Sequence, residues 1–178
     1  YPYLKNNPFI LITVHRRENF GVKLRDICNS IDKLAKKFND HIFLFPVHLN
    51  PNVRQEVLKT LDSKSNENVI LIDPIKYDEM VFLMLNTKLI LTDSGGIQEE
   101  APSLGKPLIV MREKTERLHG IKAGASILVG SNKNQIIEGV SKLINDKIAY
   151  RKMSIIKNIY GDGTASEKIV KHLVENFS

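Results

Sequence analysis

The stretch TDSGGIQEEAPSLGKP, from Thr92 to Pro107, carries the strongest local signal in the chain. It follows the apolar run Leu89-Ile90-Leu91, which predicts a strand, and Ser94-Gly95-Gly96 then opens a predicted helix. A strand that ends in a glycine-rich turn and a helix N-terminus presents free N–H groups and the positive end of the helix dipole. Both favour a phosphate, and glycine lets the backbone approach it closely.

Glu100 lies one helical turn after Gly96, so both residues should share one face of the predicted helix. Helical side chains lean toward the N-terminus, so the carboxylate can face the same ligand. A carboxylate does not bind phosphate, but it accepts two hydrogen bonds from a ribose diol. The stretch therefore predicts a nucleoside-diphosphate site; the alternative is a plain strand-to-helix turn with a solvated Glu100. It matches neither GxGxxG nor the P-loop pattern.

Length and composition indicate one soluble domain with a substantial core, since the chain has 178 residues, of which 42% are apolar. No apolar run approaches 18 residues and the start has no apolar block, so neither a membrane span nor a signal peptide is predicted. Residues 1–8 resemble the tail of a linker, and 9–178 are predicted as the domain, which suggests a piece of a larger protein. The single cysteine, Cys28, is predicted as core filler and fits a reducing, cytoplasmic compartment.

The net charge of +6 admits nucleic acid as a partner, but the lysines are scattered and no basic run contains interleaved aromatic residues. A solvated surface and a phosphorylated small ligand fit better, so no nucleic-acid partner is predicted. The histidines are dispersed, and the sequence lacks CxxC, HxxxH and carboxylates spaced as DxD. No metal site is therefore expected.

Short apolar runs alternate with helical patterns along the chain. The predicted strands are Phe9–Val14, Ile42–Pro46, Val69–Ile72, Leu89–Thr92, Leu108–Met111 and Ser126–Val129. The predicted helices are Lys23–Phe38, Pro51–Leu61, Tyr77–Leu85, Gly96–Leu104, Asn134–Asn145 and Ser166–Val174. This alternation predicts an α/β fold with a doubly wound parallel sheet, whose ligand binds beyond the carboxyl ends of the strands. Polar groups follow five of the strands, at His15-Arg16-Arg17-Glu18, His48-Leu49-Asn50, Asp73-Pro74, Ser94-Gly95-Gly96 and Arg112 to Arg117.

Two histidines and three arginines in these loops are candidate site residues. His15 can donate to a departing oxygen or shuttle a proton, or it can simply orient its loop. His48 suits a ligand contact or a backbone hydrogen bond equally well. Arg16 and Arg17 suit phosphate or carboxylate, with Glu18 as their possible ion-pair partner. Arg117 stands near a predicted helix start, where it can cover a diphosphate. The charges at Glu113, Lys114 and Glu116 are interpreted as solvated.

Several blocks together resemble the non-hydrolysing UDP-N-acetylglucosamine 2-epimerases of bacteria. They are TVHRRENFG (13–21), FPVHLNPNVR (45–54), LIDP (71–74), LTDSGGIQEEAPSLGKPLIVMR (91–112), TER (115–117) and YGDG (160–163). The resemblance spans about residues 9–175. It implies a protein about twice this long, with two Rossmann-like domains of the GT-B type, of which this chain is the C-terminal, nucleotide-binding half. The catalytic carboxylates belong to the absent N-terminal half, so the fragment alone should be inactive.

The resemblance also implies the reaction and the residues that serve it. Family members interconvert UDP-GlcNAc and UDP-ManNAc by eliminating and re-adding UDP, without a cofactor, and act as homodimers. By similarity, Ser94-Gly95-Gly96 hold phosphate, Glu100 holds ribose and Arg117 contacts the diphosphate. His15 would lie at the reacting end, and Met80 occupies a position whose backbone contacts uracil.

In some members a second, allosteric UDP-GlcNAc contacts the loops that correspond to Arg16 and His48. This chain departs from the family at Leu118-His119, where Pro-Glu is usual, beside the proposed diphosphate contact. The alternatives are the nucleotide-sugar half of a GT-B glycosyltransferase, the hydrolysing 2-epimerase branch and a pure binding module. The HRREN block favours the non-hydrolysing branch over the first two.

Overall fold

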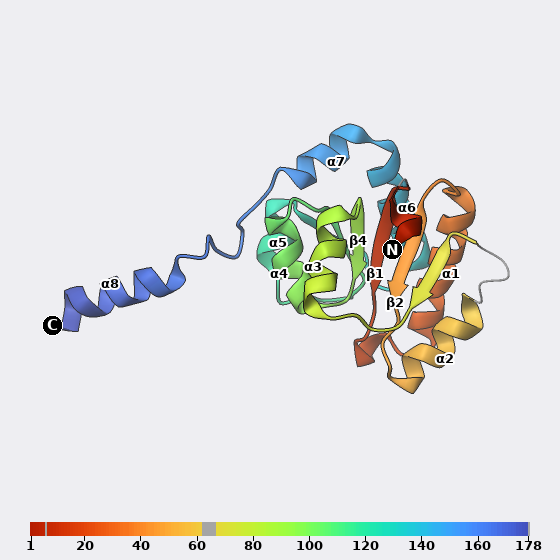
Figure 1. Ribbon diagram of the computed structural model, residues 1–178, viewed down its shortest axis with the longest axis horizontal. Coiled ribbons are helices and arrows are strands. Elements are labelled where there is room, and N and C mark those ends of the chain that lie inside the picture. The colour runs from red at the N-terminus through yellow and green to blue at the C-terminus, as the bar shows by residue number, and fades with distance from the viewer. Residues whose placement is uncertain (6, 62–66, 178) are drawn as a thin grey trace.

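A single six-stranded parallel sheet forms the centre of the molecule (Figure 1). The computed structural model describes residues 1–5, 7–61 and 67–177. The strands are β1 (Phe9–Thr13), β2 (Ile42–Pro46), β3 (Val69–Ile72), β4 (Leu89–Thr92), β5 (Leu108–Val110) and β6 (Ser126–Leu128). All six predicted strands are confirmed, and β1, β5 and β6 end one residue earlier than predicted.

Helices connect the strands and cover both faces of the sheet. They are α1 (Val22–Lys37), α2 (Pro51–Thr60), α3 (Tyr77–Asn86), α4 (Gly95–Ser103), α5 (Leu118–Ala123), α6 (Lys133–Asn145), α7 (Lys147–Ser154) and α8 (Ala165–Phe177). Short 3-10 helices occupy Pro2–Leu4 and Arg17–Asn19. The six predicted helices are confirmed within three residues at each end. The helix start predicted near Arg117 is confirmed by α5, whose extent was not predicted, and α7 was not predicted. Asn50 caps α2 as expected, because its side chain accepts from the backbone N–H of Asn52.

The strand order is β3-β2-β1-β4-β5-β6, so the chain builds outward from β1 in one direction and then from β4 in the other. Leu11 of β1 lies between Leu44 of β2 and Ile90 of β4 in register. The doubly wound α/β prediction is therefore confirmed. In such sheets the ligand crevice lies beyond the carboxyl ends of the strands where the order reverses, which here is between β1 and β4.

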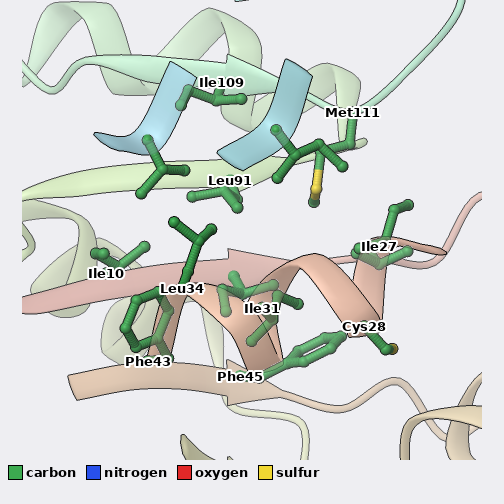
Figure 2. Packing of buried hydrophobic residues seen from close by; sticks show 14 of the residues in the cluster. Ile10, Ile27, Cys28, Ile31, Leu34, Phe43, Phe45, Leu91, Ile109 and Met111 are labelled. Carbon is green, nitrogen blue, oxygen red and sulfur yellow. The ribbon is translucent and has the colours of Figure 1, made fainter. Parts of the chain in front are cut away.

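Successive strand residues point to opposite faces and enter two separate cores. Ile10 packs in the core beneath α1, α2 and α6, while Leu11 packs in the core beneath α3 and α4. Figure 2 shows the α1 side, where Cys28, Ile31 and Leu34 face the sheet. Burial disfavours the thiolate and raises the pKa of Cys28 to about 12, so the predicted core role is confirmed.

The last helix, α8, behaves differently from the rest. It stands away from the sheet at the C-terminal end (Figure 1), and none of its residues is buried. Its apolar side chains Ile169, Val170, Leu173, Val174 and Phe177 are exposed. Within the part of the chain that the structure describes, no helix has both the length and the apolarity needed to cross a membrane.

Candidate functional site

A buried carboxylate organises the crevice between β1 and β4. Asp93, the residue after β4, is fully buried and accepts hydrogen bonds from the backbone N–H groups of His15 and Arg16, at 3.1 and 2.9 Å. The Asn19 side chain donates to the same carboxylate at 3.0 Å and to the carbonyl of Met111 at 3.1 Å. Buried charge is tolerated only when it is paired this fully. Asp93 therefore fixes the loop after β1 against the end of β4.

Two arginines meet above the N-terminus of α4. A Cβ atom placed on Gly95 would lie 3.1 Å from Nη2 of Arg16 and 3.2 Å from Cζ of Arg117. Ser94 occupies the N-cap position without a side-chain cap, so it leaves the first-turn N–H groups open. Two guanidinium groups and a helix N-terminus form an anion site, and glycine provides the space for it. Ser94, Gly95 and Gly96 are thus brought together with Arg117 as predicted.

The side chain of Arg16 carries a second feature suited to an anion. Its Nε is buried and has no hydrogen-bond partner among the described residues. A buried donor without a partner costs about 1–3 kcal/mol, so such atoms are uncommon unless a ligand supplies the acceptor. The sequence predicts Arg16 as a phosphate contact and, by resemblance, as part of an allosteric site; the geometry places it beside Arg117 at the N-terminus of α4.

A chain of hydrogen bonds connects the Arg117 loop to the start of α4. The Thr115 hydroxyl donates to Gln98 Oε1 at 2.6 Å, and the Gln98 amide donates to the Ser94 carbonyl at 3.1 Å. The same hydroxyl accepts from the backbone N–H of Arg117 at 3.1 Å. Thr115 and Gln98 are buried, so this connection is sheltered from water. The guanidinium of Arg117 also contacts the Glu99 carboxylate at 2.8 Å.

Glu100 lies on the predicted face of α4. A Cβ on Gly96 would be 3.7 Å from its Oε1, which confirms that the two residues share that face. The Tyr77 hydroxyl donates to Oε2 of Glu100 at 3.0 Å. This hydrogen bond, followed by the negative charge of Glu100, raises the pKa of Tyr77. Because Tyr77 occupies Oε2, the other carboxylate oxygen of Glu100, Oε1, stays available for a ligand hydroxyl.

An apolar hollow of about 210 Å³ adjoins the anion site. Its lining comes from the ends of β1 and β2 and from the starts of α3 and α4: Thr13, Val14, His15, Pro46, His48, Pro74, Ile75, Met80, Ser94 and Ile97. A mostly apolar pocket next to the N-terminus of α4 and its two arginines suits a planar base.

The two loop histidines meet at this hollow, with ring centroids 6.0 Å apart in a stacked arrangement. Nδ1 of His15 lies 3.3 Å from Asp93, so the carboxylate orients the imidazole. Nδ1 of His48 accepts from the backbone N–H of Asn50 at 3.1 Å. His48 therefore lines the hollow and makes the backbone contact that was its alternative role.

Comparison with known proteins identifies the family of this chain. The family model described as UDP-N-acetylglucosamine 2-epimerase matches residues 2–174. The chain belongs to the UDP-N-acetylglucosamine 2-epimerase family. It is 50% identical over 175 residues to the Campylobacter jejuni UDP-N-acetylglucosamine 2-epimerase, covering 98% of this chain and 45% of that one.

Solved structures extend the likeness to three dimensions. The Neisseria meningitidis UDP-GlcNAc 2-epimerase bound to UDP-GlcNAc superposes with a TM-score of 0.92 and 48% identity, covering 99% of this chain and 47% of that one. The S. aureus MnaA structure with UDP gives 0.91 and 39%, covering 99% and 48%. The chain thus spans about half the length of the epimerases it matches.

Some charges in this epimerase-family chain pair differently from the prediction. Glu18 does not pair with its neighbouring arginines; Arg112 donates to it at 2.7 Å and to Glu116 at 2.9 Å. The interpretation of Glu113, Lys114 and Glu116 as solvated charges is confirmed, since all three are exposed, although Glu113 also accepts from the Ser131 hydroxyl at 3.2 Å. Arg112 and Glu18 are 94 residues apart in the chain, so the prediction for Glu18, which considered only the neighbouring arginines, was wrong.

Sequence reasoning missed Asp93 and Asn19, although both stand inside the quoted family blocks. The available signal was position, because Asp93 directly follows a fully buried strand. Across the described residues, no group of histidine, cysteine and carboxylate side chains has the arrangement of a metal site.

Proposed function

We propose that this chain is the C-terminal, UDP-binding half of a non-hydrolysing UDP-N-acetylglucosamine 2-epimerase, which interconverts UDP-GlcNAc and UDP-ManNAc. The observation that carries the proposal is the convergence of the Arg16 and Arg117 guanidinium groups on Gly95, at the N-terminus of α4. A pocket for the base and a carboxylate for the ribose flank this anion site. Together they match the three parts of a nucleoside diphosphate.

Each part of UDP has a proposed partner. The diphosphate binds the first-turn N–H groups of α4 and the two guanidinium groups, and Glu100 accepts from the ribose hydroxyls. Uracil enters the apolar hollow, where the backbone at Met80 contacts it. The allosteric role implied for Arg16 and His48 stays a prediction, and the buried Nε of Arg16 supports diphosphate contact first.

The proposed reaction breaks the bond between C1 of the sugar and the UDP oxygen and removes the proton from C2. The products, UDP and a 2-acetamidoglucal, recombine with a proton delivered to the other face of C2. This chain stabilises the negative charge that develops on UDP, which is electrostatic catalysis by groups already in position. His15, oriented by Asp93, lies at the reacting end and exchanges a proton there.

The rest of the enzyme lies outside this chain. We propose a preceding Rossmann-like domain that supplies the carboxylates for the C2 proton, so the chain alone binds UDP and does not epimerise. The doubled length of the relatives supports this, as does the exposed apolar surface of α8. A homodimer and a cytoplasmic location, where nucleotide sugars are used, complete the proposal; sedimentation of the longer protein tests the former.

The direct test is calorimetric titration of UDP into this chain and into the longer protein, each with a Glu100→Ala variant. Loss of the ribose contact should cost about 1–3 kcal/mol, or roughly 5- to 150-fold in affinity. Glu138→Ala, which removes an exposed carboxylate from α6, is the matched control and should bind UDP normally.

Activity is then measured on the longer protein by following conversion of UDP-GlcNAc to UDP-ManNAc. Release of free sugar would identify the hydrolysing branch instead. If neither the chain nor the longer protein binds UDP, the proposal fails. Undiminished binding by Glu100→Ala would remove the ribose role of that residue alone.

A further inference from the structure

The start of α5 lacks the side chain that normally caps a helix. Arg117 occupies the N-cap position and makes no side-chain cap hydrogen bond. Helices favour Ser, Thr, Asp or Asn there, because an oxygen can accept from the N–H groups of the first turn. A guanidinium has no acceptor, and here it is directed to Gly95 and Glu99.

A tyrosine 43 residues further along the chain supplies the missing oxygen. The hydroxyl of Tyr160 accepts from the backbone N–H of Gly120 at 3.0 Å and donates to the carbonyl of Arg117 at 3.1 Å. Gly120 is the third residue of α5, the place where an N-cap side chain usually binds. One hydroxyl thus holds both ends of the turn that carries Arg117.

The local packing is adapted to this contact. A Cβ on Gly120 would lie 2.9 Å from the Tyr160 hydroxyl and 3.0 Å from Oγ of Ser126, so a larger residue would push the hydroxyl away. The ring of Tyr160 meets that of His119 edge to face, with centroids 6.5 Å apart. The same ring lines a hollow of about 380 Å³ shared with Glu99, the ion-pair partner of Arg117.

We propose that Tyr160 is a positioning residue for diphosphate binding: it caps α5 in place of Arg117 and so holds the Arg117 guanidinium over Gly95. The inference rests on the proposed function of that site. Tyr160 belongs to the segment between α7 and α8, which makes no other contribution to the site described above. The Arg117 side chain is free to contact the ligand because the Tyr160 hydroxyl caps α5 in its place.

The test is UDP affinity in a double-mutant cycle on the longer protein, using Tyr160→Phe, Arg117→Ala and the combined variant. Tyr160→Phe keeps the ring and removes both hydrogen bonds, and it should weaken UDP binding roughly five-fold, as expected for a lost cap. In the Arg117→Ala background the same change should have no further effect, because the group it positions is gone.

Tyr150→Phe is the matched control, since it removes the hydrogen bond from the Tyr150 hydroxyl to the carbonyl of Lys88, which precedes β4 at the amino end of that strand. Its UDP affinity should equal that of the unchanged protein. Unchanged affinity in Tyr160→Phe, or an equal loss in the Arg117→Ala background, would overturn the positioning role. Absence of UDP binding by the unchanged protein would instead refute the proposed function.

Discussion

The inner and outer sides of the site are built from different interactions. On the inner side, the fully buried Asp93 accepts from two backbone N–H groups and from Asn19. On the outer side, Arg117 is held by Glu99 and Glu116, whose side chains are 44% and 61% exposed. A buried carboxylate cannot lose its partners cheaply, whereas an exposed ion pair contributes little and exchanges readily. Asp93 therefore fixes the position of the loop after β1, whereas Arg117 can exchange its contacts with Glu99 and Glu116 for contacts with a phosphate.

The largest effect should come from breaking the inner side. Asp93→Ala leaves the donors of the loop after β1 buried without an acceptor, and we expect the free energy of unfolding to fall by about 3 kcal/mol. Urea denaturation measures it. Asp73→Ala removes the exposed ion pair with Arg54 and should change stability by less than about 0.5 kcal/mol. Similar losses in the two variants would contradict the distinction between buried and exposed carboxylates.

The outer side should affect binding instead of stability. Arg117→Ala removes the proposed charge-assisted hydrogen bonds to the diphosphate, and we expect UDP affinity to fall by about ten- to a hundredfold. Titration calorimetry at two salt concentrations measures this, and the loss should be larger at low salt. Arg54→Ala, which breaks a comparable ion pair on α2, should bind UDP normally. An Arg117→Ala protein with full affinity would remove this residue from the site.

The smallest effect concerns acid stability. Hydrogen bonds from Arg112, the largest cause, lower the pKa of Glu116 from 4.5 to about 2, and they also lower the pKa of Glu18. A depressed pKa contributes stability that is fully present above pH 4.5 and is lost as the pH falls through about 2. Glu116→Gln should therefore make the unfolding free energy fall less steeply over that range.

Thermal unfolding at a series of pH values measures this slope. Glu138→Gln changes an exposed carboxylate outside the network and should keep the slope of the unchanged protein. An unaltered slope in Glu116→Gln would mean that solvent already screens the pair with Arg112.

The two helices whose extents were not predicted, α5 and α7, show where local sequence signals end. The side chain of Asp146 accepts from the N–H groups of Ile148 and Ala149, so α7 has a local cap that the sequence displays. No comparable residue begins α5, whose cap comes from Tyr160. Helix α7 was missed although its capping signal is local, whereas the sequence near α5 predicts a helix start but does not show the residue that caps it.

By itself, the sequence determined the order of the strands and of the six predicted helices, the glycine-rich turn at Ser94-Gly95-Gly96 and the position of Glu100 on the same face as Gly96. These follow from apolar runs, glycine conformation and helical spacing, all of which act over a few residues. Only the tertiary structure decided that Asp93 holds the loop after β1 and that Glu18 pairs with Arg112. Those choices depend on which loops the sheet brings together, and hydrogen bonds form between groups that are close in space however far apart they are along the chain.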